Sequence, residues 1–216
     1  VVATAMKGMG NGGHRLAGRS VVFVTHAAFW RERTAGGGEV EAYEHYFDSL
    51  LRESKRRGLP VAILAVGPQS TFRTRSTSDR WKERLSSRKD DRFVHINRFV
   101  SPGVAAAVLK AFGKAVRIHR RFRGAPGLAR AFSHRGVTFD DLSAEDLGRT
   151  LLHQVPWAAR CLLEFDAAFR ELDPRLVCLY AESSGLGRAA VEGARALKVR
   201  TLGIQHGILY PNYFSY

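Results

Sequence analysis

The sequence predicts an α/β protein with a Rossmann-like, mostly parallel β-sheet that carries helices on both faces. Two observations support this class. Short apolar segments rich in β-branched residues alternate along the chain with longer amphipathic segments. The apolar segments are continuous rather than interrupted by polar residues, which is typical of parallel strands covered on both sides. With 216 residues, of which 45% are hydrophobic, the chain can bury a substantial core.

The amino-terminal elements begin with a glycine-rich segment, 1–19, that predicts a flexible lead-in. Residues 20–26 are β-branched and predict a buried strand, and a loop is expected at 27–38. Residues 39–58 predict a helix, because apolar residues recur there at helical spacing, with glutamates early and Lys/Arg late. These apolar residues are Val40, Tyr43, Phe47, Leu50 and Leu51.

The later elements continue the alternation of strand and helix. Further strands are expected at 61–67, 92–100, 174–182 and 199–207. Further helices are expected from Pro102 to about Phe122 and at 143–155, 156–173 and 183–197. Ser143 and Asp146 have a spacing similar to a capping box, so Ser143 is expected to begin its helix. One apolar face of the helix at 156–173 is predicted to contain Trp157, Cys161, Leu162, Phe165, Phe169 and Leu172. One domain is therefore predicted over 20–207, followed by the start of an interdomain linker at 208–216.

Ionisable side chains follow three of the predicted strands. Right-handed crossovers place the carboxyl ends of parallel strands on one edge of the sheet, where open α/β sheets bind ligands. His26, Glu182 and His206 are expected at that edge. A carboxylate beside imidazoles is typical of proton transfer and ligand binding. Simpler roles stay open, since Glu182 can hold Arg188 or a backbone amide and His26 can be a satisfied polar residue at a strand end.

Two predicted helix N-termini face the same edge of the sheet. Ser183 and Ser184 precede one of them, and Gly36–Gly38 precede the other. Free N–H groups at a helix N-terminus bind anions, and glycines let the backbone approach a phosphate closely. The glycine run matches neither a dinucleotide-binding fingerprint nor a P-loop, so a merely flexible loop stays an alternative. The two serines are also good helix N-caps and need no other role.

The segment Leu176–Gly207 contains "YAES", "GLGRAAVEGARALKV" and "RTLGIQHG". It resembles the amino-terminal half of GT-B glycosyltransferases, and is most similar to bacterial enzymes of surface-polysaccharide assembly and to the CDP-glycerol glycerophosphotransferase-like group. The resemblance implies two Rossmann-like domains. The amino-terminal domain mostly receives the acceptor, and the carboxyl-terminal domain holds most of the contacts to the nucleotide sugar. Because nine residues follow Gly207, the chain is expected to be half of such an enzyme, completed by a second domain or a partner chain.

The resemblance also implies roles for the residues at the strand ends. It suggests transfer of a sugar from a nucleotide-sugar donor to a surface glycan or glycolipid acceptor, with no bound metal and no other cofactor. Glu182 or His26 would be the catalytic base. Substrate contacts would come from His206, Gln205, Gly207, Ser183, Arg188, Gly36, Gly37, Gly38 and Arg31.

The positive charge is concentrated in the middle of the sequence. The chain has a formal net charge of +14, and the segment from Arg52 to Arg135 alone contains 21 Lys/Arg against 5 Asp/Glu, a net of +16. Such a segment attracts polyanions. In a glycosyltransferase it would hold a cytoplasmic enzyme at the anionic inner membrane, as a peripheral protein, or against an anionic glycolipid. A solvated basic face without a dedicated partner is the simpler alternative.

Two other function classes stay open. A basic α/β protein that binds nucleic acid would use aromatic residues interleaved with arginines, namely Phe72, Trp81, Phe93, Phe99 and Phe122. The sequence argues against nucleic acid, because those aromatics have core-like spacing and no RRM, KH or helix-turn-helix signature is present. A nucleotide-sugar epimerase would share the two-domain architecture of a transferase.

Cys161 and Cys178 both lie in apolar segments and are predicted to be reduced core thiols, as in a cytosolic protein. The longest apolar run, around Val104 to Leu109, is far shorter than the roughly 20 residues of a membrane-spanning helix. No secretory signal is visible in the sequence.

Overall fold

The computed structural model describes residues 20–26, 29–34, 40–67, 92–123, 125, 127, 131–138, 140–180 and 184–204. The chain divides into two compact units. The sheet unit contains the described residues of 1–100 and 164–216, and the helical unit is Ser101–Leu163. The predicted boundaries at 19/20 and 207/208 border or lie within undescribed segments, so that division of the chain stays a prediction.

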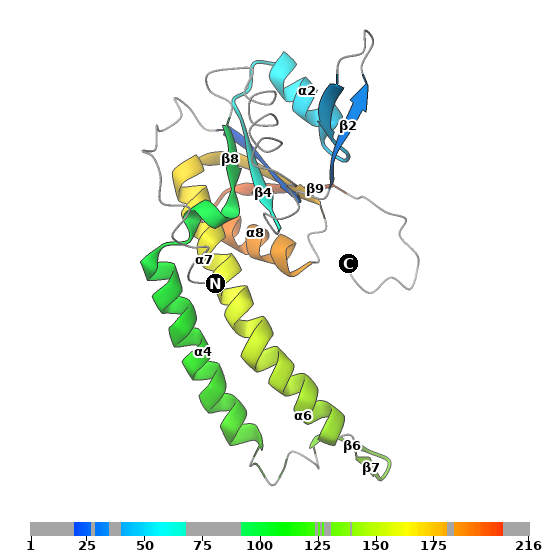
Figure 1. The fold of residues 1–216 in the computed structure, drawn as a ribbon, viewed down its shortest axis with the longest axis vertical. Helices are drawn as coiled ribbons and strands as arrows, with labels where there is room; N and C mark the ends of the chain where they lie inside the picture. Colours follow the sequence, from blue (N-terminus) through cyan, green and yellow to red (C-terminus); the bar gives the residue numbers. More distant parts are fainter. Residues whose placement is uncertain are drawn as a thin grey trace. The chain divides into compact units, whose positions relative to one another are not determined.

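The sheet unit contains a five-stranded parallel sheet in the order β5-β4-β1-β8-β9 (Figure 1). Its strands are β1 (Ser20–His26), β4 (Val61–Val66), β5 (Arg92–His95), β8 (Pro174–Tyr180) and β9 (Arg200–Ile204). Along the chain, the third, second, first, fourth and fifth parallel strands therefore lie side by side in that order. This is the doubly wound arrangement of Rossmann-like folds, and it confirms the predicted α/β class.

The central strands are buried on both faces. Every residue of β4 is buried, as is every residue of β1 except its last. Phe23 and Ile63 pack in one cluster with Phe47 and Leu51, which flank or belong to helix α2 (Asp48–Arg56). Burial on both faces explains why the strand segments are continuously apolar.

Helices α7 (Val155–Leu172) and α8 (Gly185–Ala196) pack closely against each other within the sheet unit, where α7 contributes its residues from Glu164 onward. A Cβ atom placed on Gly193 of α8 would lie 3.2 Å from the Cβ of Phe165. The hydroxyl of Ser20 donates a hydrogen bond to the carbonyl of Leu172 at 3.1 Å, which links the start of β1 to the end of α7.

The segment after β1 differs from the prediction. Residues 27–38 were expected to be a loop and 39–58 a helix, but β2 (Trp30–Thr34) and β3 (Val40–Glu44) form an antiparallel pair, and α2 begins only at Asp48. The Glu44 carboxylate accepts hydrogen bonds from the backbone N–H groups of Tyr46 and Phe47, at 2.7 and 2.6 Å. Because those groups are satisfied by a side chain, the backbone turns before the helix starts.

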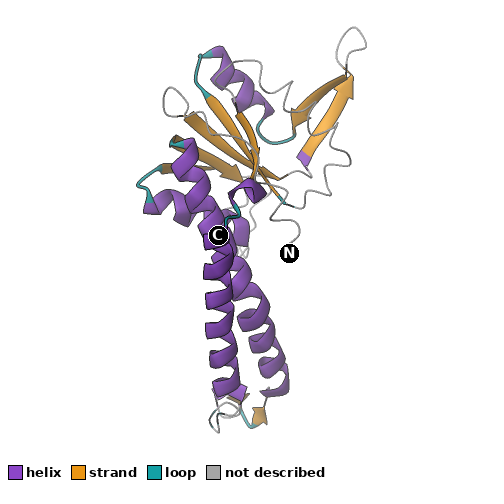
Figure 2. Ribbon diagram, turned by 60° about the vertical axis from the view of Figure 1, so that its left-hand side comes forward, coloured by secondary structure: helices purple, strands orange, loops and turns teal. Residues whose placement is uncertain are grey.

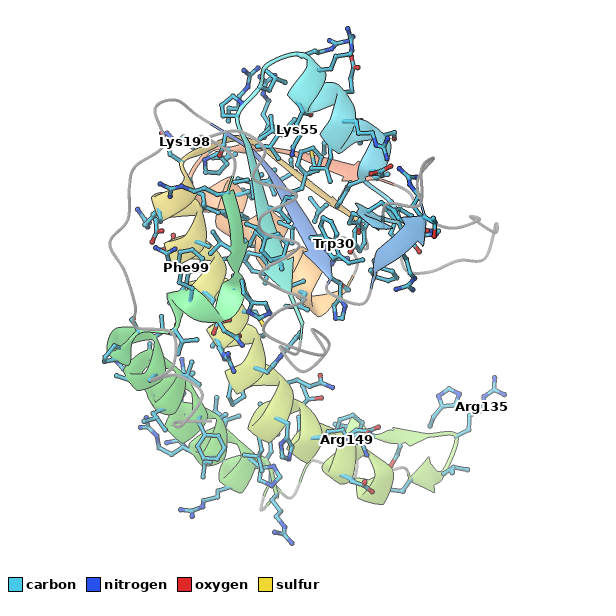
Figure 3. All side chains as sticks on the ribbon, turned by 45° about the horizontal axis from the view of Figure 1, so that its top comes forward. Trp30, Lys55, Phe99, Arg135, Arg149 and Lys198 are labelled. Atoms are coloured by element: carbon cyan, nitrogen blue, oxygen red, sulfur yellow. The ribbon has the colours of Figure 1, made fainter. Side chains whose placement is uncertain are left out.

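The helical unit contains the confirmed helix α4 (Pro102–Arg123), which lies beside α6 (Asp140–Arg149) and the π-helix η5 (Thr150–Gln154) (Figure 2). A small hairpin, β6 (Ser133–His134) and β7 (Val137–Thr138), precedes α6. Arg135 lies at the tip of this hairpin (Figure 3). The prediction that Ser143 begins a helix is wrong, because α6 already starts at Asp140.

The predicted break between two helices at Pro156 is also wrong, because η5 and α7 follow α6 without interruption. Proline lacks an N–H group and crowds the preceding turn, and a π-turn widens the helix at that place. The predicted apolar face of α7 is partly correct. Four of its residues are buried, whereas Trp157 is 46% and Leu162 41% exposed.

Three further predictions can be compared with the structure. The predicted strand at 92–100 is shorter, and its second half is a 3₁₀ helix, η4 (Ile96–Phe99). Cys161 and Cys178 are both buried thiols that are not joined in a disulfide, and burial raises the pKa of the Cys178 thiol to about 11. Among the described helices, none is both long and apolar enough to cross a membrane.

Candidate functional site

The strands around the centre of the sheet end in polar residues. His26 is the last residue of β1 and is in register with Val66, the last residue of β4. Strand β5 ends at His95 and β8 ends at Tyr180. The connections from β1 and from β8 run toward opposite edges of the sheet, so the topological switch point lies between these two strands. Open α/β sheets bind ligands at this point, outside the carboxyl ends of the strands.

A buried acid lies beneath this edge. The Glu44 side chain is fully buried, and its Oε1 accepts a hydrogen bond from the Thr25 hydroxyl at 2.8 Å. The hydroxyl oxygens of Thr25 and Tyr180 are 3.3 Å apart. The Tyr180 oxygen accepts a hydrogen bond from the backbone N–H of His26 at 2.6 Å. One network therefore connects Glu44 to the last residues of β1 and β8.

The directions of these hydrogen bonds follow from the number of protons available. Thr25 has one hydroxyl proton and donates it to Glu44, so its oxygen can only accept from Tyr180. The Tyr180 proton therefore points toward Thr25 or toward the Glu44 carboxylate. Burial raises the pKa of Tyr180, and the nearby charge of Glu44 adds to this rise. Tyr180 consequently stays a neutral phenol that fixes the backbone of His26.

Burial also raises the pKa of the Glu44 carboxyl, whereas hydrogen bonds from Phe47, Thr25 and Tyr46 oppose the rise. A buried carboxylate is costly unless donors surround it. The donors here come from β1 and from the turn before α2. Glu44 therefore joins the β2–β3 hairpin to the sheet.

The imidazole of His26 lies directly against the backbone of Gly67, the residue that follows β4. A Cβ atom on Gly67 would be 2.5 Å from His26 Nε2, and the φ angle of Gly67 is +104°. Both features require glycine at this position. The ring also makes an edge-on contact with Phe29 at a centroid distance of 5.9 Å. Burial lowers the pKa of His26, so the imidazole is neutral at physiological pH.

A second histidine, His95, contacts the backbone carbonyl of Gly67. His95 Nδ1 accepts a hydrogen bond from the backbone N–H of Asn97 at 3.2 Å, so the ring proton resides on Nε2. His95 Nε2 lies 3.1 Å from the Gly67 carbonyl oxygen and donates to it. The ends of β1, β4 and β5 are thus joined through two imidazoles and one glycine. We call His26, Gly67, His95 and the Glu44–Thr25–Tyr180 network the sheet-edge site.

Three of the predicted site residues lie within the described parts of the chain. His26 is in the sheet-edge site. Arg31 is exposed on β2 and donates a hydrogen bond to the Trp30 carbonyl at 3.2 Å, and Arg188 is exposed on α8. Helix α8 starts as predicted, with the Ser184 hydroxyl accepting from the N–H of Gly187 at 3.0 Å. The other predicted site residues lie outside the described residues, namely Gly36, Gly37, Gly38, Glu182, Ser183, Gln205, His206 and Gly207.

Sequence reasoning missed most of the sheet-edge site. His95, Gly67 and Tyr180 end or follow strands, so the rule that selected His26 also applies to them. Glu44 gave no such signal, because it was assigned to a helix. Phe93 contacts Trp30 at a ring-centroid distance of 6.0 Å, and Phe99 is buried. These two aromatics of the nucleic-acid alternative therefore pack in the protein.

The helical unit contains a separate cavity of about 440 Å³. Its lining includes His119 and Arg123 of α4, Arg149 of α6 and His153 of η5. Arg149, labelled in Figure 3, already pairs with Glu145 at 3.0 Å and with Asp146 at 3.5 Å, which balances its charge. The cavity is therefore a weaker candidate for an anion site than its arginines suggest.

The described residues contain no group of three or more His, Cys, Asp or Glu side chains able to hold a metal ion. The groups that the sheet-edge site does offer are a neutral imidazole at the end of β1 and a network that fixes its backbone. This arrangement can accept a proton from a hydroxyl and can hydrogen-bond a polar ligand.

No family model matches the chain, and no curated protein sequence matches it. Among solved structures, the chain has a likeness to tyrosyl-tRNA synthetase from Leishmania major in complex with tyrosinol, with a TM-score of 0.35 and 8% sequence identity. The likeness covers 94% of this chain and 33% of the synthetase chain, so this chain spans a third of that protein's length. At this TM-score the likeness carries no argument about function.

Proposed function

We propose that the chain is the acceptor-side, amino-terminal domain of a GT-B glycosyltransferase, which transfers a sugar from a nucleotide donor to a surface glycan or glycolipid. The observation that carries the proposal is the neutral imidazole of His26 at the switch point of a doubly wound sheet. The similarity of Leu176–Gly207 to such enzymes supports the same function.

In the proposed reaction His26 is the base. Its lowered pKa keeps the imidazole unprotonated at neutral pH. It would take the proton of the acceptor hydroxyl while the acceptor oxygen bonds to the anomeric carbon of the sugar. The bond from that carbon to the phosphate oxygen breaks, and the nucleotide leaves with its phosphate charge.

The Glu44–Thr25–Tyr180 network supports this role by fixing His26 rather than by reacting. The Tyr180 hydroxyl holds the His26 N–H, and Gly67 leaves room for the ring. Positioning of this kind matters because small displacements of a catalytic group lower the rate strongly. Tyr180 and Glu44 are therefore positioning residues.

The remaining roles follow from the resemblance. Glu182 is the alternative base. His206, Gln205, Gly207, Ser183 and the Gly36–Gly38 loop would contact the sugar or its phosphates. Arg188 would orient an anionic group, and Arg31 is a further candidate for a substrate contact. A carboxyl-terminal domain or a partner chain would hold most of the nucleotide sugar. We further propose a cytoplasmic enzyme that is peripheral at the inner membrane, where glycolipid acceptors reside.

The test uses the natural full-length protein with a panel of nucleotide sugars and lipid-linked or soluble glycan acceptors. Mass spectrometry would identify the products, so that sugar transfer is distinguished from epimerisation of the donor. The variants are Glu182→Gln, His26→Ala and His206→Ala, each checked for folding by circular dichroism. Transfer by the wild type that is lost in these variants supports the proposal. Wild-type turnover by all three variants, or an epimerised donor as the product, contradicts it.

A further inference from the structure

Helix α4 is unusual in its charge. It contains six Lys/Arg and no Asp/Glu over its 22 residues. The acidic residues of the helical unit all lie in α6, namely Asp140, Asp141, Glu145 and Asp146. No carboxylate of α4 itself therefore offsets its positive charge.

The basic residues of α4 form a line. Lys110, Lys114, Arg117 and Arg121 are all exposed, and they follow the spacing i, i+4, i+7, i+11 that places side chains along one strip of a helix. We call these four residues the basic strip.

A second strip on the same helix is apolar. Ala105, Leu109 and Phe112 follow the spacing i, i+4, i+7 and are exposed. Leu109 is 70% exposed and Phe112 is 42% exposed. With 3.6 residues per turn, the mean directions of the two strips are about 140° apart around the helix. The buried residues Val104 and Ala115 lie on the other side of α4. We call Ala105, Leu109 and Phe112 the apolar strip.

Exposed apolar side chains are concentrated in this part of the protein. Of the ten large hydrophobic side chains that are exposed among the described residues, eight belong to the helical unit, and Leu50 and Leu202 are the exceptions. Single exposed hydrophobic residues are ordinary, but a concentration of them marks an interaction surface.

We propose that α4 lies on an anionic lipid bilayer, with its apolar strip inserted among the headgroups and its basic strip on anionic lipid phosphates. A helix whose exposed side carries an apolar strip and a cationic strip has the character of an interfacial membrane helix. Each Lys or Arg near an anionic bilayer contributes on the order of 1 kcal/mol. This inference does not depend on glycosyl transfer, and it names the surface that would make the protein peripheral.

The alternative occupants fit the surface less well. Two copies of α4 would bring two sets of six positive charges together. Nucleic acid would engage the basic strip through its phosphates but would leave Leu109 and Phe112 in water. An anionic bilayer can bury the apolar strip and place lipid phosphates beside the basic strip at the same time.

The experiment measures binding of the full chain to vesicles of phosphatidylcholine alone and of phosphatidylcholine mixed with phosphatidylglycerol, at low and high salt. We expect binding to the anionic vesicles that weakens as salt rises, and little binding to the neutral ones. Lys110→Glu combined with Lys114→Glu should weaken binding to anionic vesicles by more than about tenfold. Leu109→Gln should weaken it by roughly tenfold, because the leucine no longer leaves water.

The matched control is Arg175→Glu combined with Arg200→Glu, which makes the same change in net charge at exposed positions of the sheet unit. It should bind anionic vesicles within about twofold of wild type, if α4 rather than total charge determines binding. Circular dichroism should show unchanged helix content in every variant. Equal losses in the α4 variant and the control would overturn the proposal. So would wild-type binding by Leu109→Gln, or binding to single-stranded RNA without binding to anionic vesicles.

Discussion

The sheet-edge site and helix α4 treat charge in opposite ways. In the sheet-edge site one carboxylate, Glu44, is fully buried and is surrounded by donors from Thr25, Tyr46 and Phe47. On α4, four basic side chains are exposed to solvent in a line. A buried charge must have its partners built into the fold, so its removal affects stability. An exposed charge costs the fold little and is available for a partner. The two regions should therefore respond differently to mutation.

The largest expected effect is that of Glu44→Ala. It leaves two backbone N–H groups and the Thr25 hydroxyl without their acceptor, and should lower the free energy of unfolding by about 3 kcal/mol. Glu44→Gln is the matched control. The glutamine amide oxygen can accept from both backbone N–H groups, and its amide N–H can donate to the Thr25 hydroxyl. The free energy of unfolding of Glu44→Gln should therefore fall by less than about 1 kcal/mol. Urea denaturation measures both. Equal stability of the two variants would mean that the network does not join the hairpin to the sheet.

Gly67→Ala should have the next largest effect. Its new Cβ would meet the His26 ring at 2.5 Å, in a backbone conformation with φ of +104°. Gly136→Ala is the control that separates the steric clash from the backbone strain. Gly136 also has a positive φ, of +80°, but no atom lies within 4 Å of the added Cβ. Gly67→Ala should cost roughly 2 kcal/mol more than Gly136→Ala in thermal or urea unfolding. A difference near zero would show that His26 does not rest on Gly67.

A smaller effect concerns pH. Burial lowers the pKa of His26 below 6.5, so the unfolded chain binds a proton more readily than the folded protein. The free energy of unfolding should therefore fall as pH drops below about 6.5 and level off below the folded pKa. His26→Gln should lack this component. Urea denaturation of both proteins at a series of pH values measures the difference, and parallel pH profiles would contradict the burial of the ring.

The smallest effect on stability is expected on α4. Lys110→Glu combined with Lys114→Glu changes exposed side chains without buried partners, and should shift the free energy of unfolding by no more than about 0.5 kcal/mol. A loss comparable to that of Glu44→Ala would show that the basic strip is structural, and would remove the contrast between the two regions.

The fold was predictable where burial dominates. Strand β4 and the central residues of β1 and β8 are continuously apolar because they are covered on both faces, and that pattern is visible in the sequence. Helices α4 and α8 were predicted near their observed bounds, with Pro102 in the first turn of α4 and Ser184 capping α8. In these elements the local sequence preference and the tertiary environment agree.

The prediction failed where tertiary contacts decide. Val40 and Tyr43 have helical spacing with Phe47, yet they pair with β2, because Glu44 takes the backbone donors of the next residues. The local pattern does not contain Thr25 or Tyr180, which complete that network from strands distant in sequence. A search for polar residues at the carboxyl ends of predicted strands identifies His26 and also applies to His95. No such pattern in the sequence selects Glu44.

The central claim is that the His26 imidazole at the end of β1 accepts the proton in sugar transfer. The most direct test compares kcat/KM for nucleotide release from the nucleotide sugar in His26→Ala and His45→Ala variants of the full-length protein. His45 is a nearby exposed histidine whose ring lies 4.8 Å from that of Tyr46. We predict a loss of about 100-fold or more for His26→Ala and less than about twofold for His45→Ala. Equal rates in the two variants, with both folded, would contradict the account.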